Sequence, residues 1–219
     1  MKFTDWGLIA YKEAWDKQHA IVERMTAPKA LPGEDEQQVI FCEHPHVYTL
    51  GRHGQADNLL VSEDVLTRIG ADFYHTNRGG DVTYHGPGQV VCYPLVDLKR
   101  QQCTVKNYIF TLEEIVIRTL RHYRIEAGRI AGAAGVWLDA GTPAMRKICA
   151  IGVHVSHGVT MHGFALNANT DLSYYRHINP CGFTDKGVTS VQHETGKPAD
   201  MDALKAHLRR YFEEWLTKK

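Results

Sequence analysis

The chain has 219 residues, of which 43% are hydrophobic and 23% are charged, a composition typical of a globular protein with one substantial core. Its 25 Lys and Arg residues equal its 25 Asp and Glu residues in number, which argues against a general nucleic-acid binder, because such proteins carry a basic excess. The sequence lacks an apolar run of about 18 residues and a signal-peptide pattern, so we expect a cytoplasmic protein with a single domain over residues 1–219.

The first half of the chain predicts two helices and several strands. Apolar residues recur at helical spacing over Tyr11–Met25, and a shorter helix is expected over Ser62–Arg68. Val47–Leu50 is expected to pair with the apolar strand Gln38–Cys42 after a short turn. Segments rich in Val, Tyr, Phe and Thr predict three further strands, which are Asp72–Thr76, Val82–Tyr84 and Gln89–Val96.

The second half begins with the strongest helical pattern of the chain, over Lys106–Tyr123, and ends in another helix with an apolar stripe from Met201 to Trp215. Between them we expect three strands, the last two joined by a hairpin turn at His157-Gly158: Val136–Leu138, Arg146–Val155 and Thr160–Leu166. Strands outnumber helices in the middle of the chain. The sequence therefore predicts an α+β fold with mixed, largely antiparallel sheets flanked by helices.

A dense segment of glycines and polar residues is the first candidate for function: Arg78-Gly-Gly-Asp-Val-Thr-Tyr-His-Gly-Pro-Gly-Gln89. Glycines allow positive φ angles and let the backbone approach a ligand closely, and Arg78 and His85 are potential hydrogen-bond donors. Two interpretations remain open at this point. The segment is either a ligand-binding loop or a glycine-rich hairpin between two strands.

Lys147 is the second candidate, because it stands inside an apolar strand pattern. Burying an ammonium group is costly, so this lysine must be paired, reach solvent with its tip or have a function. A desolvated lysine has a lowered pKa and becomes a usable base near neutral pH. The alternative is an edge strand on which Lys147 points into water.

The third candidate is a reactive thiol. Cys42 and Cys92 lie in strand patterns and are expected to be small core residues. Cys149 is two residues from Lys147 on a strand and should share a face with it, whereas Cys181 lies between Pro and Gly in an irregular loop. Spacing alone leaves both Cys149 and Cys181 open as the partner of Lys147. No Cys and His spacing matches a zinc site, so we expect neither a metal nor a cofactor.

Taken together, these segments resemble the lipoyl(octanoyl) transferases in order and spacing from about Val39 to Val191. The long glycine motif with a downstream Pro-Cys-Gly is specific, whereas each piece alone is weak. Departures from the family pattern are mild. Asp81 stands where other members often have a different polar residue, and Asn77 stands where an acid is common. The resemblance rests on Glu43–Arg52, Arg78–Gln89, Lys147–Gly152, Met161–Asn167 and Pro180–Gly182.

The resemblance implies a fold similar to the catalytic domains of biotin and lipoate protein ligases. It also implies that an octanoyl or lipoyl group leaves acyl carrier protein and becomes an amide on a lysine of a lipoyl domain. The implied acceptors are the lipoyl domains of 2-oxo acid dehydrogenase E2 subunits and the glycine-cleavage H protein. Neither nucleic acid nor a membrane is implied as a partner.

The resemblance further implies that Cys181 is the nucleophile, which forms a thioester acyl-enzyme, and that Lys147 is its base. The backbone amides that would stabilise the oxyanion are not identified. The implied acyl pocket is lined by Arg78, Gly79, Gly80, Asp81, Val82, Thr83, Tyr84, His85, Ala150, Ile151, Gly152, Gly163, Phe164 and Ala165. Glycines 79, 80, 152 and 163 are expected to leave room for the acyl chain.

Two other functions are consistent with parts of this pattern. An ATP-dependent lipoate or biotin protein ligase would share the fold, but its acyl-adenylate chemistry needs no cysteine, so Cys181 counts against it. A catalytically silent domain that only binds acyl carrier protein or lipoyl domains would have no reason to keep an acidic thiol. Activity without nucleotide and thiol reactivity separate these alternatives from acyl transfer.

Overall fold

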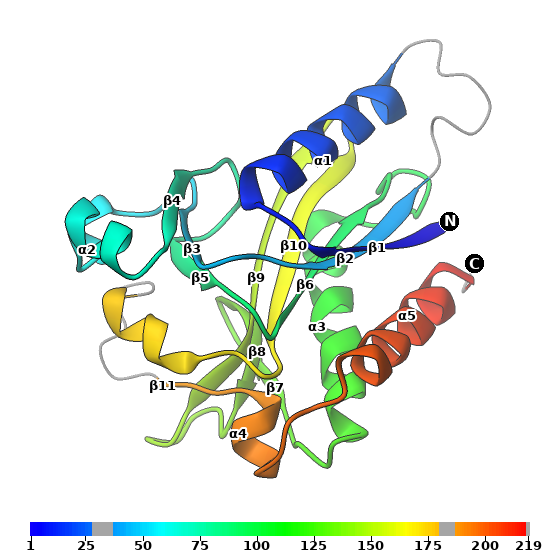
Figure 1. Cartoon of the computed structure of the whole chain (residues 1–219). Coiled ribbons are helices and arrows are strands. Elements are labelled where there is room, and N and C mark those ends of the chain that lie inside the picture. Colours follow the sequence, from blue (N-terminus) through cyan, green and yellow to red (C-terminus); the bar gives the residue numbers. More distant parts are fainter. Residues whose placement is uncertain (28–36, 180–186, 218–219) are drawn as a thin grey trace.

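The computed structural model describes residues 1–27, 37–179 and 187–217. Two sheets and three long helices build the fold (Figure 1). Across the described ranges, no helix is both long enough and apolar enough to cross a membrane.

The larger sheet is mixed. Its β1–β2 and β9–β11 pairs are parallel and its other pairs are antiparallel, so the expectation of a largely antiparallel mixed sheet is confirmed. The strand β11 (Gly187–Val188) pairs with β9 beside the main path. The strands of that path, in spatial order, are β1 (Lys2–Leu8), β2 (Gln38–Glu43), β6 (Gln89–Leu95), β10 (Val159–Asn167), β9 (Arg146–Ser156), β8 (Ala133–Leu138) and β7 (Gly128–Ile130).

The smaller sheet corrects one expectation about pairing. Its central strand β3 (Val47–Leu50) is parallel to β4 (Asp72–His75) and antiparallel to β5 (Val82–His85). The expected pairing of Val47–Leu50 with the strand at Gln38–Cys42 is therefore wrong. Both edges of β2 are occupied, by β1 and β6, so β2 has no free edge for β3.

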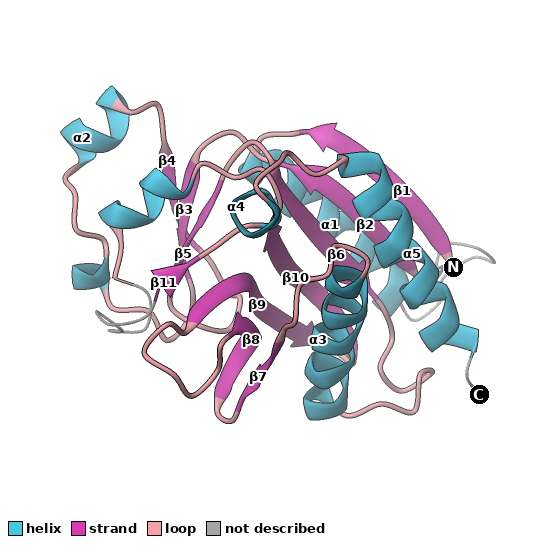
Figure 2. Cartoon of the chain, turned by 90° about the horizontal axis from the view of Figure 1, so that it is seen from below, coloured by secondary structure: helices cyan, strands magenta, loops and turns pink. Residues whose placement is uncertain are grey.

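The long helices cover both faces of the larger sheet (Figures 1 and 2). The helices α3 (Val105–Arg121) and α5 (Met201–Thr217) lie side by side on one face, and α1 (Tyr11–Thr26) lies on the other. Thr104 caps α3 by accepting a hydrogen bond from Asn107 N at 3.2 Å. The short elements are α2 (Glu63–Arg68), α4 (Val191–Thr195) and the 3₁₀ segments η1 (Ala56–Asn58) and η2 (Leu172–His177).

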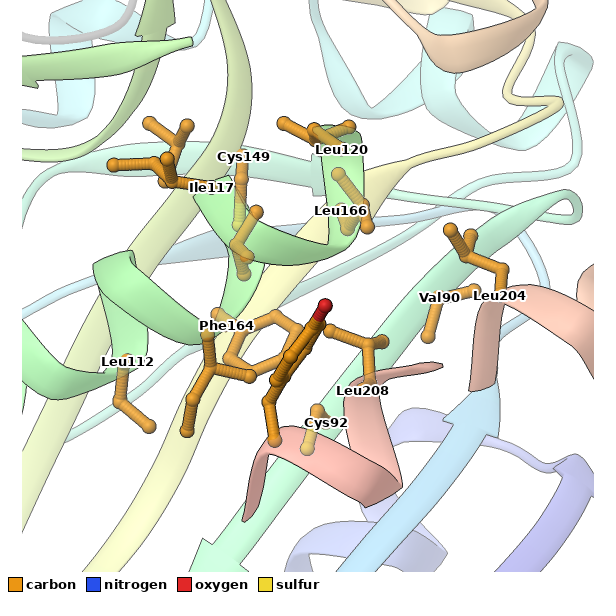
Figure 3. Packing of buried hydrophobic residues seen from close by; sticks show 14 of the residues in the cluster. Val90, Cys92, Leu112, Ile117, Leu120, Cys149, Phe164, Leu166, Leu204 and Leu208 are labelled. Carbon is orange, nitrogen blue, oxygen red and sulfur yellow. The ribbon is translucent and has the colours of Figure 1, made fainter. Parts of the chain in front are cut away.

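Alternation along the strands divides the core into two layers. On β10, Phe164 and Leu166 pack toward α3 and α5, whereas Met161 and Ala165 pack toward α1. Figure 3 shows the first layer, in which buried side chains from the sheet meet those of α3 and α5. The sheet is thus apolar on both faces.

A close backbone contact joins β10 to β6 at Gly163. A Cβ atom at this position would lie 2.1 Å from the Cys92 carbonyl oxygen and 2.7 Å from Pro94 Cδ. Only a glycine permits this approach. The two strands continue in regular antiparallel register from Phe164 onward.

We expect Gly163→Ala to lower the free energy of unfolding by about 1–3 kcal/mol, because the added methyl group forces backbone to move. Urea unfolding measures the change. Gly128→Ala is the matched control in a strand, since a Cβ atom there meets nothing within 4 Å. Equal stabilities of the two variants would contradict the close contact.

Candidate active site

A cavity of about 1080 Å³ opens between the glycine segment, the strands β9 and β10 and the start of α1. This volume suits a small-molecule or cofactor-sized ligand. Apolar side chains such as Val91, Ile151 and Phe164 form part of the wall, and buried Tyr and His side chains form another part.

The glycine segment is a ligand-loop candidate and not a hairpin. The segment contains β5, and the strands before and after it, β4 and β6, belong to different sheets, so the hairpin interpretation is wrong. Residues 78–81 instead cross β9, where Gly79 N donates a hydrogen bond to the Val153 carbonyl at 2.9 Å. The loop therefore connects the two sheets and borders the cavity at the same time.

A buried cation holds this loop in place. The Arg78 guanidinium donates to the carbonyl oxygens of Thr49 at 2.5 Å, Asp81 at 2.6 Å and Gly79 at 3.0 Å. It also donates to Thr49 Oγ1 at 2.9 Å. Because these acceptors belong to β3 and to the loop itself, Arg78 fixes the loop on the smaller sheet.

Tyr and His side chains of the cavity wall are hydrogen-bonded to buried residues outside the wall. His85 Nδ1 donates to Gln89 Oε1 at 2.8 Å, and the His85 ring stacks on Tyr11 with centroids 5.8 Å apart. Tyr93 donates its hydroxyl to His44 Nε2 at 2.7 Å. Burial lowers the pKa of His85 well below its usual value and that of His44 to about 4, so both rings are neutral at pH 7.

His162 combines burial with an uncommon backbone conformation. Its φ of 57° lies in the left-handed region, although it sits within β10. Gln18 Oε1 accepts its backbone N–H at 2.9 Å, and its Nε2 donates to Asn77 Oδ1 at 2.7 Å. Burial is the main cause that lowers the pKa of His162 to about 3.

Lys147 lies at the cavity, on an interior strand. Because β9 at Lys147 pairs with β8 on one side and with β11 on the other, the interpretation of Lys147 as a solvent-facing residue of an edge strand is wrong. The side chain is half-buried, lines the cavity and places Nζ 4.4 Å from the centre of the Trp137 ring. An ammonium over an indole face is a favourable cation–π contact.

Cys149 does not share this environment. The pairing of β8 with β9 changes register between Val136↔Cys149 and Trp137↔Lys147, so a bulge separates the two positions. Such a bulge reverses the side of the sheet that a residue faces. The expectation that Lys147 and Cys149 share a face is wrong for this reason.

Cys149 instead lies in the core beneath α3, beside Ile117 and Leu166 (Figure 3). Burial raises the pKa of its thiol well above the usual value, which disfavours the reactive thiolate. Cys181, with Pro180 and Gly182, lies outside the described residues. The described residues on either side of that segment, Asn179 and Gly187, both line the cavity.

The remaining residues expected at the site divide into two groups. Tyr84 is absent from the cavity wall; it is buried in β5 with its hydroxyl 2.7 Å from His46 Nδ1 and its ring stacked on Tyr174. The others line the cavity: Arg78, Gly79, Gly80, Asp81, Val82, Thr83, His85, Ala150, Ile151, Gly152, Gly163, Phe164 and Ala165.

Glycines 79, 152 and 163, however, do not leave the room that we expected of them, whereas a Cβ atom on Gly80 would lie at an ordinary 3.5 Å from Arg78 Nη1. A Cβ atom on Gly152 would lie 2.6 Å from the Gly79 carbonyl oxygen, and one on Gly79 would lie 3.2 Å from the Val153 carbonyl oxygen. At Gly163 the Cys92 carbonyl occupies the same space. These glycines serve backbone packing around the cavity.

Sequence reasoning missed several residues of the wall. His162 and Asn167 flank the expected residues in the segment Met161–Asn167, so that motif carried a usable signal. Tyr11 and Trp137 carried no such signal in the sequence, because each fits an ordinary apolar pattern of a helix or a strand. As far as the structure describes the chain, no three His, Cys, Asp or Glu side chains cluster as metal ligands would.

Comparison with known proteins places these features in one family. A family model described as the lipoyl protein ligase A/B catalytic domain matches residues 10–213. An octanoyltransferase of Bacteroides fragilis (strain YCH46) is 54% identical over 207 residues, which cover 94% of each chain. An octanoyltransferase of Parabacteroides distasonis is 51% identical, with 97% of each chain covered.

Solved structures share the fold at low sequence identity. A bi-partite lipoate protein ligase from Thermoplasma acidophilum superposes with a TM-score of 0.73 at 17% identity, covering 98% of this chain and 83% of that one. Biotin protein ligase from Aquifex aeolicus gives a TM-score of 0.52 at 11% identity, covering 99% and 68%. The expected likeness to the catalytic domains of lipoate and biotin protein ligases is confirmed.

The buried, neutral His162 predicts a loss of stability in acid. The unfolded chain protonates this histidine near pH 6.5 and the folded protein only near pH 3, so the stability is complete above pH 6.5 and falls as the pH decreases. Between about pH 6 and 4.5, His162→Gln should reduce the slope of unfolding free energy against pH by about 1.4 kcal/mol per unit. Denaturant unfolding at several pH values measures it, with His53→Gln at an exposed histidine as the control; an unchanged slope in His162→Gln would refute the prediction.

Proposed function

The chain belongs to the family of lipoyl protein ligase A/B catalytic domains, and on this premise we propose that it is an octanoyltransferase of protein lipoylation. Relatives named octanoyltransferase are 46–54% identical to it over nearly the whole chain, whereas the ligases of known structure are 11–17% identical and share the fold alone. The observation that carries the proposal is this near-complete match, to which the structure adds a cavity with Lys147 in its wall.

The proposed donor is octanoyl-acyl carrier protein. The proposed acceptors are lysines of lipoyl domains, in the E2 subunits of 2-oxo acid dehydrogenases and in the glycine-cleavage H protein. A neighbour in the fold comparison, the ligase from Thermoplasma acidophilum, is described together with its E2 lipoyl domain, which supports an acceptor of this kind. We also propose a cytoplasmic location, which the free thiols of Cys42, Cys92, Cys103 and Cys149 support.

In the proposed first half-reaction, the Cys181 thiolate attacks the thioester carbonyl carbon of the donor. A new carbon–sulfur bond forms at Cys181, the donor's carbon–sulfur bond breaks, and the donor thiolate takes up a proton as it leaves. A thioester replaces a thioester, so the step is close to balanced in free energy. An ammonium close to the thiol favours the thiolate, and we assign this role to Lys147.

In the second half-reaction, the acceptor's lysine amine attacks the acyl-enzyme. The carbon–nitrogen bond of the amide forms, the bond to Cys181 breaks, and the amine must lose a proton. Neutral Lys147 is the proposed base. Three facts about the cavity support these assignments: Lys147 lines it, Asn179 lines it, and Cys181 is two residues from Asn179 in the sequence.

The alternative to transfer, an ATP-dependent lipoate or biotin protein ligase, requires different substrates. A ligase activates a free acid with nucleotide, whereas a transferase receives an acyl group that is already activated as a thioester. The two functions therefore separate on the need for ATP.

We expect incubation with octanoyl-acyl carrier protein, without nucleotide, to add one octanoyl group to the protein through a hydroxylamine-labile bond at Cys181. Intact mass before and after hydroxylamine, followed by peptide mapping, measures this. Cys181→Ser and Cys149→Ser are the paired variants, and only the first should abolish labelling. Labelling that requires ATP would favour the ligase, and a label on Cys149 would overturn the nucleophile.

Lys147→Ala should raise the pKa of the Cys181 thiol and slow both half-reactions, because one ammonium both stabilises the thiolate and later acts as the base. Iodoacetamide reactivity against pH measures the first effect, and single-turnover transfer to a lipoyl domain measures the second. Lys99→Ala, at an exposed lysine, is the control. If the alkylation profiles of Lys147→Ala and wild type coincide, the two residues are not a pair.

A further inference from the structure

We propose that Glu113, on α3, is a positioning residue that fixes Lys147 in the candidate active site through the backbone amide of Gly135. The inference rests on the proposed function, in which Lys147 is the base. The Glu113 side chain borders neither the cavity nor Lys147 in the described contacts, so its action passes through the β7–β8 hairpin.

The orientation of Lys147 originates in the change of register between β8 and β9. Cys149 is opposite Val136 and Lys147 is opposite Trp137, so one residue of β9, Ile148, is extra at this place. Without this bulge the period of two would put Lys147 on the same side as Cys149, in the core under α3. The direction of Lys147 thus depends on this bulge of β9 against β8.

The side chain of Lys147 packs against the backbone at Gly135. Gly135 has a φ of 129°, which favours glycine, and a Cβ atom there would lie 2.7 Å from the Cys149 carbonyl oxygen. The same Cβ position is 3.5 Å from Lys147 Cε and 3.7 Å from its Cδ. The lysine stem therefore lies along the Gly135 backbone, with its ammonium over Trp137.

A hydrogen bond to Glu113 holds the backbone of Gly135 in place. Gly135 falls outside the paired positions of both β7–β8 and β8–β9, and its N–H group is buried. Glu113 Oε1 accepts that N–H at 3.1 Å. A buried amide without an acceptor is destabilising, so the carboxylate stabilises the backbone of β8 beside the bulge.

The carboxylate is itself held from the other side. Glu113 is 7% exposed, and Arg129 Nε donates to its Oε2 at 3.0 Å. Arg129 also donates to Glu114 Oε2 at 2.6 Å and lies over the Phe110 ring at 3.9 Å. Glu113 and Glu114 therefore share an arginine, but the hydrogen bond to Gly135 comes from Glu113. Glu114 is the natural control.

The experiment compares three variants. Glu113→Asp keeps the charge but withdraws the carboxylate by one methylene from Gly135. Glu113→Gln keeps an oxygen acceptor for Gly135 and gives up the charge, and Glu114→Gln leaves the Gly135 contact intact. Each is measured in single-turnover aminolysis of the acyl-enzyme by a lipoyl domain across pH, and in thermal unfolding.

We expect Glu113→Asp to slow aminolysis by about tenfold or more and to shift its pH profile, because a displaced base loses alignment with the attacking amine. Glu113→Gln should recover most of the rate, and Glu114→Gln should match wild type. In a Lys147→Ala background, Glu113→Asp should have no further effect. A Glu113→Asp enzyme with the wild-type rate and profile, or with equal losses in both backgrounds, overturns the inference.

A second measurement separates this inference from the proposed function. Competitive acetylation of Lys147 with acetic anhydride at several pH values, followed by peptide mapping, reports the environment of its amine without any acyl transfer. Glu113→Asp should change the reactivity profile of Lys147, whereas Glu114→Gln should leave it unchanged. Should Lys147→Ala retain full aminolysis, the base assignment fails, and the acetylation profile still decides whether Glu113 positions Lys147. Should Glu113→Asp not fold, the half-exposed Arg129→Gln replaces it, with the same expected direction.

Discussion

The change of register between β8 and β9 is the constraint on which the candidate site depends. It turns Lys147 out of the core and over Trp137, while Cys149 two residues later stays packed under α3. A regular strand would put Lys147 and Cys149 on the same face, either both in the core or both at the cavity. The bulge allows one β-strand to complete the hydrophobic core and to supply an amine to the cavity within three residues.

A second constraint joins the two sheets. The buried Arg78 binds carbonyl oxygens of β3 and of its own loop, and Gly79 binds β9, so one short segment fixes the smaller sheet on the larger one. Each buried N–H of the guanidinium that finds a carbonyl partner lowers the cost of burying the charge. The closeness of the loop and β9 explains Gly79 and Gly152, because a Cβ atom on either residue would press against a backbone carbonyl oxygen of the other segment.

The sequence predicts best what depends on local pattern. The helices α1 and α3 have strong apolar stripes, and the structure places them within a residue or two of the expected bounds. The strand β1 lacked such a signal, because it is half exposed and exists through its pairing with β2. The side faced by Lys147 was beyond prediction for a related reason, since it depends on a bond between Glu113 and Gly135 that lie 22 residues apart.

The fold alone does not decide between ligation and transfer, because ligases at 11–17% identity share it. Side chains at the site must therefore account for the difference between ligation and transfer. Two histidines of the cavity wall, His85 and His162, are held neutral by burial. Lys147 stands at that wall on an indole face. The apolar part of the wall suits a fatty acyl chain, and the amine of Lys147 suits the proton that the acceptor lysine must lose.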